Sequence, residues 1–416
     1  MYSNRRMKKL TGRDFLTILF ILLGSLILVK SVWNGINDLG ISDFSTYYYT
    51  AKGVFAPRPE HPYVNIVPFY PFFYPPQSLL LFRLFTLIPF APAKALWAMA
   101  NGLFAVGFVF LLTKIFGKSH KLSHLDNAVI FLLTTVFFPL QNTISGGQIN
   151  VFLLFLTTAA FYFFQQKRDG LTGILLGIAT VIKISPFLLL LYFLLKRQWK
   201  ISVSGLATMG GLTLLTELFV KRGIHWYYLR HVVDDISKQS KGGFRDQSLR
   251  NFLTQFPPLN KQVSTILEKI PQRPNFLDHE MLINLVSWGI IFAVITFLAY
   301  ICRKKITDRR ATSIVLEYNL FLTIAVVGTG LTWFHQYAML LLPLLTSFVI
   351  LAKSKAREHN YLAFLAVSFS YLVTAIPWEN WELWGRFGGL WPFGMLGGIF
   401  LNFIILLALR LRWIKT

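Results

Sequence analysis

Long apolar runs, separated by short loops rich in Lys and Arg, are the feature that most constrains this chain. A helix of about 20 predominantly apolar residues crosses the hydrocarbon core of a membrane and satisfies its own backbone hydrogen bonds there. Only 14% of the residues are charged and 54% are apolar, whereas a typical soluble domain has about 25% charged residues. We therefore predict an all-α polytopic membrane protein and exclude a soluble enzyme and a disordered chain.

The charge balance is strongly basic, with 41 Lys and Arg residues against 18 Asp and Glu residues and a formal net charge of +23. The basic residues lie between apolar runs instead of forming one basic face, so a nucleic-acid-binding protein is also excluded. Cys302 is the single cysteine, and no disulfide can therefore form within the chain.

The first apolar run, residues 15–33, follows Arg5, Arg6, Lys8 and Lys9 and has no small-residue cleavage signature. We interpret it as an uncleaved first span with a cytoplasmic N-terminus. Further spans are expected to begin near Ala91, Asn127, Val151, Leu171, Pro186, Ile201, Met281, Thr312, Tyr337, Tyr361 and Trp391. This pattern predicts about twelve transmembrane helices in a single domain that covers residues 1–416.

The segment 75–89 is ambiguous, because it is short, has prolines near both ends and carries Arg83. If it spans the membrane, the later basic loops fall outside; if it does not, they fall inside. We take it as an interfacial helix, which leaves both termini cytoplasmic. The two larger loops, residues 34–90 and 221–280, are then external and are expected to carry short helices; loops beyond about 15 residues are usually functional.

Asp43 opens a stretch that can wind as a helix, with Tyr47 about one turn further on. This places a carboxylate at the outer mouth of the protein among aromatic rings. Ser42 and Asp43 are also both suitable helix caps, so a purely structural role stays open.

Lys183 lies in an apolar stretch that is interrupted by Ser185 and Pro186. A charged residue at membrane depth costs at least about 2.5 kcal/mol and usually faces a cavity. Because a new helix begins at Pro186, Lys183 and that helix N-terminus together suit an anion. The alternative is that the Lys183 side chain extends to the headgroups.

Polar residues in two further segments are candidates for ligand contacts. Gln148 and Asn150 follow two glycines and suit sugar hydroxyls, while Arg245 and Arg250 could hold a phosphate and Asn251 a hydroxyl. The alternative for the arginines is a solvated basic loop near anionic lipid.

His335 follows Trp333 at the mouth of a helix, where a lone histidine is more often structural than catalytic. No Cys and His residues have the spacing of a zinc site, and no phosphate-binding loop or dinucleotide fingerprint is present. An ATP-driven or nucleotide-sugar enzyme is therefore disfavoured.

These segments, in this order, resemble the GT-C-type membrane glycosyltransferases, and most closely family 87 (DUF2029-like), which includes polyprenyl-phosphate-mannose-dependent α-mannosyltransferases. The resemblance covers most of the chain, although Thr332 and Gln336 stand where the family pattern has a Ser and often a second His. The matching residues are Asp43, Tyr48, Ala51, Phe73, Tyr74, Pro75, Pro76, Leu96, Trp97, residues 147–150, residues 173–186 with Lys183, Ser248, Asn251, Trp333 and His335.

The resemblance implies a GT-C-like fold and an inverting transfer of a sugar, with mannose as the family's usual donor sugar, from a polyprenyl-phosphate-linked donor to a lipid or glycan hydroxyl. Asp43 would be the general base, with His335 as a supporting or alternative base. Lys183, Arg245 and Arg250 would bind the donor phosphate. The sugar and the acceptor would contact Tyr47, Tyr74, Gln148, Asn150, Asn251 and Trp333.

The resemblance also implies a multi-pass protein of a bacterial-type plasma (inner) membrane, surrounded by membrane lipids, and the basic inner loops place the site on the outer side. No metal or other cofactor is expected, and no nucleic acid. A carrier or flippase of lipid-linked sugars would also be basic and polytopic, but transporters typically have internal repeats, and none is visible in the sequence. A scaffold without catalysis would leave Asp43 and Lys183 unexplained.

Overall fold

The computed structural model describes residues 11–38, 42–58, 60–64, 71–233, 246–268, 279–330, 332–354, 360–376 and 391–412. Within these ranges the regular elements are helices, and one isolated bridge joins Asp246 to Trp333. The first half contains α1 (Gly12–Asn37), α2 (Asp43–Val54), α3 (Ser78–Phe85), α4 (Phe90–His120), α5 (His124–Val136), α6 (Phe138–Ser145), α7 (Asn150–Gln165), α8 (Asp169–Ile182) and α9 (Phe187–Leu195). The second half contains α10 (Trp199–Phe219), α11 (Ile224–Tyr227), η1 (Tyr228–Val232), α13 (Leu249–Gln255), α14 (Pro257–Glu268), α15 (His279–Ile301), α16 (Thr312–Val327), η2 (Phe334–Leu340), α17 (Leu341–Ala352), α18 (Tyr361–Ala375) and α20 (Trp391–Arg410).

The helices confirm an all-α polytopic membrane protein. Five of them are long and apolar enough to cross a membrane: α1, α4, α10, α15 and the continuous pair η2 and α17. The pair α5 and α6, bent by 59°, adds a sixth, and five further apolar helices are shorter. Each span start expected from the sequence lies within three residues of a helix start. The count of about twelve spans stays a prediction for the five shorter helices. Helix α9, where a span was expected from Pro186, has nine residues and is by itself too short to cross the membrane.

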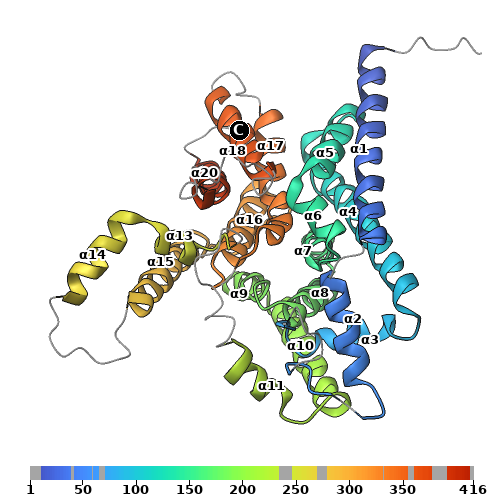
Figure 1. Cartoon of the computed structure of the whole chain (residues 1–416). Helices are drawn as coiled ribbons and strands as arrows, with labels where there is room; N and C mark the ends of the chain where they lie inside the picture. The colour runs from blue at the N-terminus through green and yellow to red at the C-terminus, as the bar shows by residue number, and fades with distance from the viewer. Residues whose placement is uncertain are drawn as a thin grey trace, which may run out of the picture.

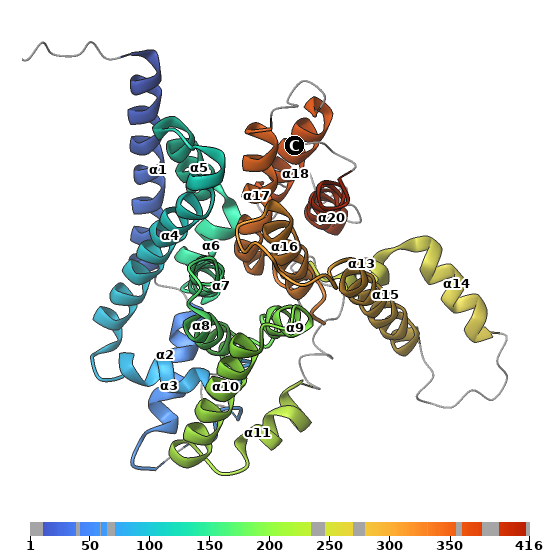
Figure 2. The same cartoon turned by 180° about the vertical axis from the view of Figure 1, so that it is seen from behind.

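The helices gather into a bundle with two flanks (Figure 1 and Figure 2). α1, α4 and α5 form one flank, while α13, α14 and α15 project from the opposite one, and α2 and α3 lie beside α8 and α10 at one end. Gln77 just before α3 donates a hydrogen bond to Thr213 of α10 over 2.8 Å, which fixes that end. Many apolar side chains on α1, α10 and α15 are exposed, as suits faces that meet lipid.

The ambiguous segment 75–89 contains only the eight-residue helix α3. Such a helix is about 12 Å long, far shorter than the hydrocarbon core of about 30 Å. Leu79 and Phe82 of α3 are buried in the main apolar core. Helix α3 alone is therefore too short to cross the membrane, which agrees with the interfacial interpretation, and both larger loops carry short helices as predicted.

Cys302 directly follows α15 and is fully buried. It lies close to Glu317 on α16, a carboxylate that also accepts a hydrogen bond of 2.7 Å from Arg410 on α20. Helices α15, α16 and α20 are thus joined at this end of the bundle through polar side chains.

Helices α8 and α10 approach each other through glycines. A Cβ atom at Gly173 would lie 2.2 Å from the carbonyl oxygen of Ile201, and one at Gly177 would lie 2.7 Å from the carbonyl oxygen of Gly205. Small residues allow such close backbone contact between membrane helices. This contact sets the position of α8, whose C-terminal end carries Lys183.

We predict that Gly173→Ala lowers the melting temperature of the detergent-solubilised protein. The added methyl group meets backbone atoms that cannot rotate away, and overpacking of this kind costs about 1–3 kcal/mol. Gly170→Ala is the matched control on the same helix, because a Cβ atom there meets nothing within 4 Å. Equal melting temperatures of the two variants, measured by fluorescence-detected size exclusion after heating, would contradict the close α8–α10 contact.

Candidate active site

The local structure around Asp43 shows that a neighbouring residue, and not the Asp43 carboxylate, caps helix α2. Ser42 is the N-cap of α2, and its side chain accepts a hydrogen bond from the backbone N–H of Ser45. Asp43 is the first residue of the helix, and its own backbone N–H donates to the carbonyl of Gly146 over 3.1 Å. The Asp43 side chain is therefore not needed as the cap.

The turn at residues 146–150 is held against the beginning of α2. Gly147 has a φ of +68°, a left-handed conformation that glycine adopts without strain. A Cβ atom at Gly147 would lie 2.9 Å from the Cβ atom of Phe44, so no other residue fits without displacement. The indole N–H of Trp97 on α4 donates to the carbonyl of Gly147 over 2.9 Å. These contacts bring Gln148 to Asp43.

Gln148 connects the Asp43 carboxylate to two tyrosines. Its Nε2 donates to Oδ2 of Asp43, and its Oε1 lies 3.3 Å from the hydroxyl groups of both Tyr47 and Tyr74. The two hydroxyls are 2.7 Å apart. One of the two hydroxyls donates to the other and leaves one proton for Oε1 of Gln148. Because Oε1 accepts from a tyrosine and Nε2 donates to the carboxylate, the amide of Gln148 has one favourable orientation. Gln148 and Tyr47 are buried.

Lys183 faces the same place from the C-terminal end of α8. The helix ends at Ile182, and Lys183 takes an extended conformation. Its Nζ donates to Oδ1 of Asn150 over 3.3 Å. Asn150 is 0% exposed, so Lys183 extends to a buried partner, which favours the cavity interpretation over extension to the headgroups. Nδ2 of Asn150 has no hydrogen-bond partner among the described residues.

The electrostatics of the site raise the pKa of Asp43 from 3.8 to about 7, because burial disfavours the charged carboxylate. The hydrogen bond from Gln148 and the positive charge of Lys183 oppose this shift. Burial also raises the pKa of Tyr74 above its usual value, so that its phenol stays a hydrogen-bond donor at neutral pH. A carboxyl group with a pKa near the working pH is well suited to accept and release a proton.

The segment around His335 is joined to the second large loop. Oδ1 of Asp246 accepts hydrogen bonds from the backbone N–H of Thr332 over 3.0 Å and of Ser248 over 2.9 Å. Trp333 forms a bridge with Asp246, and its ring is stacked on that of His335 with centroids 5.9 Å apart. Asp246 was not predicted from the sequence; its position two residues before Ser248, the cap of α13, was the available signal.

Helix α6 connects His335 to the Asp43 site. The hydroxyl of Thr143 donates to the carbonyl of His335 over 2.9 Å. Gly146, which binds the backbone N–H of Asp43, lies three residues further along the chain, or roughly 5 Å along the helix axis. The backbones of His335 and Asp43 are therefore held by the same short helix.

Two residues predicted to bind ligand have structural contacts. Arg250 forms an ion pair with Glu280 at the beginning of α15, and the side chain of Asn251 donates to the carbonyl of Asp246 over 2.5 Å. These contacts connect α13 to α15 and to the Asp246 turn. The third, Arg245, lies outside the described residues. Among the described residues, no three His, Cys, Asp or Glu side chains gather as a metal site would require.

Taken together, the helices and the Asp43 site define a polytopic membrane protein with a half-buried carboxylate that interacts electrostatically with a lysine. The chain belongs to glycosyltransferase family 87, which it matches over residues 72–329. This match confirms the family that the ordered sequence motifs resemble.

Known relatives are similar over part of their length. The chain is 29% identical over 184 residues to a polyprenol-phosphate-mannose-dependent α-(1-2)-phosphatidylinositol pentamannoside mannosyltransferase of Mycolicibacterium smegmatis, which covers 42% of each protein. It is 27% identical over 174 residues to a polyprenol-phosphate-mannose-dependent α-(1-2)-phosphatidylinositol mannoside mannosyltransferase of Mycobacterium tuberculosis, covering 39% of this chain and 40% of the relative. The pentamannoside enzyme of M. tuberculosis is 29% identical over 122 residues, covering 29% of this chain and 28% of the relative. Each similarity thus spans less than half of the relative.

Among solved structures, ArnT from Cupriavidus metallidurans bound to undecaprenyl phosphate is similar to 96% of this chain and to 78% of its own length. The sequence identity is 13% and the TM-score is 0.36.

We predict that Ser42→Ala lowers the stability at pH 8 and that Asp43→Asn does not. Loss of the Ser42 cap costs about 1 kcal/mol. The folded state raises the pKa of Asp43, so ionisation of this carboxyl destabilises the fold increasingly as the pH rises from 3.8 towards about 7. At pH 8, Asp43→Asn is therefore expected to melt at the same or a higher temperature than the wild type, and this advantage shrinks towards pH 5. A lower melting temperature for Asp43→Asn at pH 8 would make the carboxylate a structural group.

Proposed function

We propose that this protein transfers a sugar, with mannose as the first candidate, from a polyprenyl-phosphate-linked donor to a hydroxyl group of a lipid or glycan acceptor, with inversion at the anomeric carbon. The observation that carries the proposal is the Asp43 carboxylate, oriented by Gln148 and facing Lys183. Membership of family 87 and the names of the relatives support the reaction class and the lipid-linked donor.

In the proposed reaction, the acceptor oxygen attacks the anomeric carbon while the bond from that carbon to the phosphate oxygen breaks. Asp43 takes the proton of the acceptor hydroxyl, and the departing polyprenyl phosphate keeps the bonding electron pair. No covalent intermediate is needed. Gln148 is then a positioning residue, since it donates to one oxygen of the carboxylate and leaves the other available. The Tyr47 and Tyr74 hydroxyls hold Gln148 in turn.

Lys183 and Asn150 are proposed to bind the phosphate of the donor. Charge develops on the leaving phosphate, and a cation in a site with little water stabilises it strongly. Burial lowers the pKa of Lys183 to about 7, and a bound phosphate would favour its charged form. The unpartnered Nδ2 of the buried Asn150 supplies a hydrogen-bond donor beside Lys183. For Arg250 to join them, phosphate would have to replace the carboxylate of Glu280. We propose that these cationic groups serve without a metal ion.

We propose contacts to the sugar and acceptor at the segment that carries Trp333 and His335. The Trp333 ring is partly exposed, and an aromatic face of this kind suits the apolar face of a sugar. His335 stays the alternative base, because α6 holds its backbone close to that of Asp43.

The decisive experiment measures transfer of radiolabelled mannose from polyprenyl-phosphate mannose to lipid or glycan acceptors, in EDTA-containing buffer, by membranes that contain the protein. We predict that Asp43→Asn lowers the turnover by about 10²- to 10⁴-fold, the usual effect of losing a general base. Donor binding should be retained, because Asn keeps the shape of the residue. A variant that keeps more than about a tenth of the wild-type rate would place the base elsewhere, and His335 would be examined next.

The pH dependence of the same reaction gives a second readout. The wild-type rate should fall as the pH decreases through about 7, since Asp43 must be ionised to accept a proton. Gln148→Leu removes the hydrogen bond that lowers the pKa of Asp43, and its acid limb should move to higher pH. An acid limb that stays in place would show that a different group controls the rate.

We propose that the Asp43 site faces the outer side of a bacterial-type plasma membrane. The basic loops at the opposite end of the spans support this orientation. In a Cys302→Ser background, a cysteine at the exposed position Arg58 should react with a membrane-impermeant maleimide in intact cells. A cysteine at the exposed position Lys200 should react only after permeabilisation. The opposite result would place the site, and the donor, on the cytoplasmic side.

A further inference from the structure

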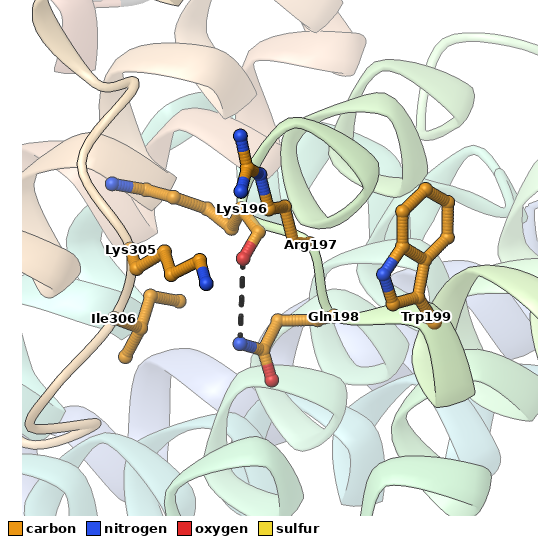
Figure 3. Close-up of a pocket in the computed structure, with 6 residues that line it drawn as sticks. All are labelled: Lys196, Arg197, Gln198, Trp199, Lys305 and Ile306. Carbon is orange, nitrogen blue, oxygen red and sulfur yellow. Dashed lines mark hydrogen bonds between the residues drawn. The ribbon is translucent and has the colours of Figure 1, made fainter.

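A second site candidate lies away from Asp43, in an open cavity of about 670 Å³. Its walls come from the turn between α9 and α10 and from the segment that follows α15. Figure 3 shows Lys305 extending from the second wall towards the first, with Gln198 opposite. The lining residues are Lys196, Arg197, Gln198, Trp199, Lys305 and Ile306.

The cavity lies at the ends of two long apolar helices. Trp199 is the first residue of α10, and Lys305 follows the last residue of α15 by four positions; both helices are long and apolar enough to cross a membrane. The ends of such spans lie at the level of the lipid headgroups. A tryptophan at this position is typical of a membrane interface.

The cavity is also separate from the Asp43 site. It lies near the beginning of α8, where Asp169 holds Arg309, and Arg309 also donates to Gln198 over 3.2 Å. Lys183 is at the other end of α8. The 14 residues of this helix place the two sites roughly 21 Å apart along its axis.

The charges around the cavity are not balanced. Lys196 is buried and paired with Glu317 over 2.5 Å, and Arg410 binds the same carboxylate, so one positive charge is in excess there. Arg197 and Lys305 are exposed, and neither forms an ion pair with a carboxylate in the part of the chain that the structure describes. Two uncompensated cations therefore line one concave site, which suits a phosphate group. The amide of Gln198 is already bonded to Arg309 and to the carbonyl of Lys196.

An apolar track leads from the cavity along α10. Trp199 is 61% exposed, Val203 62% and Leu206 50%. These residues stand at positions i, i+4 and i+7 and so share one face of the helix. A free phosphate ion would make no use of this face, whereas the acyl chain of a lipid would lie along it.

We propose that this cavity binds the phosphate headgroup of an anionic membrane phospholipid, with Arg197 and Lys305 as its cationic contacts and the exposed face of α10 along an acyl chain. The lipid is a bound partner and is not consumed. The bound lipid would hold the α9–α10 turn against the segment after α15. Within the protein, the side chain of Lys196 already connects these two segments by donating to the carbonyl of Lys304.

The test is native mass spectrometry of the full-length protein in detergent, titrated with phosphatidylglycerol and with phosphatidylcholine. The wild type should bind phosphatidylglycerol more tightly, and Arg197→Gln/Lys305→Gln should lose this preference. Each cation near an anionic headgroup contributes about fivefold in affinity, so the double substitution should weaken phosphatidylglycerol binding by about 25-fold. The matched control is Lys200→Gln/Lys304→Gln, which removes two charges from the same segments without altering the lining, and it should bind almost as the wild type does.

Several outcomes would overturn the proposal. An equal loss in both double variants would reduce the effect to general surface charge, and equal binding of the two lipids by the wild type would remove the headgroup preference. Competition by inorganic phosphate at the same concentration as the lipid would assign the cavity to a soluble anion. If the Arg197→Gln/Lys305→Gln variant does not fold, the wild type decides alone: its phosphatidylglycerol binding must weaken as salt rises from about 0.1 M to about 1 M, because screening shortens the reach of both cations.

Discussion

The site depends on the contact between the first turn of α2 and the turn at residues 146–150. One hydrogen bond, from the Asp43 N–H to the Gly146 carbonyl, and the lack of a side chain at Gly147 allow the two backbones to meet. Four helices are positioned by this contact: α2 carries Asp43, α4 supplies Trp97, α6 leads to His335 and α7 begins with Asn150. A bulkier residue at Gly147 would separate them all, because each is connected through the same few atoms.

The polar groups of the bundle are divided between its two ends. At the Asp43 end, a carboxyl and a lysine are half-buried without a direct ion pair between them, so both remain available to a ligand. At the other end, Glu317 is shared by Lys196 and Arg410, and Arg309 is paired with Asp169. Partnered charges of this kind fix helices to one another, whereas the incompletely paired charges at Asp43 and Lys183 leave binding capacity for a substrate.

Much of the fold could be predicted from the sequence, because apolar length and proline positions determine where membrane helices begin. The site was only partly predictable. Asp43, Lys183, Gln148 and Asn150 stood out as polar residues in apolar or glycine-containing surroundings, but Gln148 and Asp43 are 105 positions apart and their hydrogen bond follows from the packing of α2. Arg250 was expected to bind phosphate, yet its partner Glu280 lies 30 residues away on a helix whose docking no local pattern reveals. Asp246 was not predicted for the same reason, since its partner Thr332 is 86 positions away in the sequence.

The burial of Cys302 has a consequence for the chemistry that the protein can undergo. Burial raises the pKa of its thiol to about 12, and the nearby carboxylate of Glu317 adds to the effect. At neutral pH very little of the thiol is then in the thiolate form, which is the form that reacts with oxidants and alkylating agents. As Cys302 is the single cysteine of the chain, the protein has no readily ionised thiol for oxidants or alkylating agents to attack.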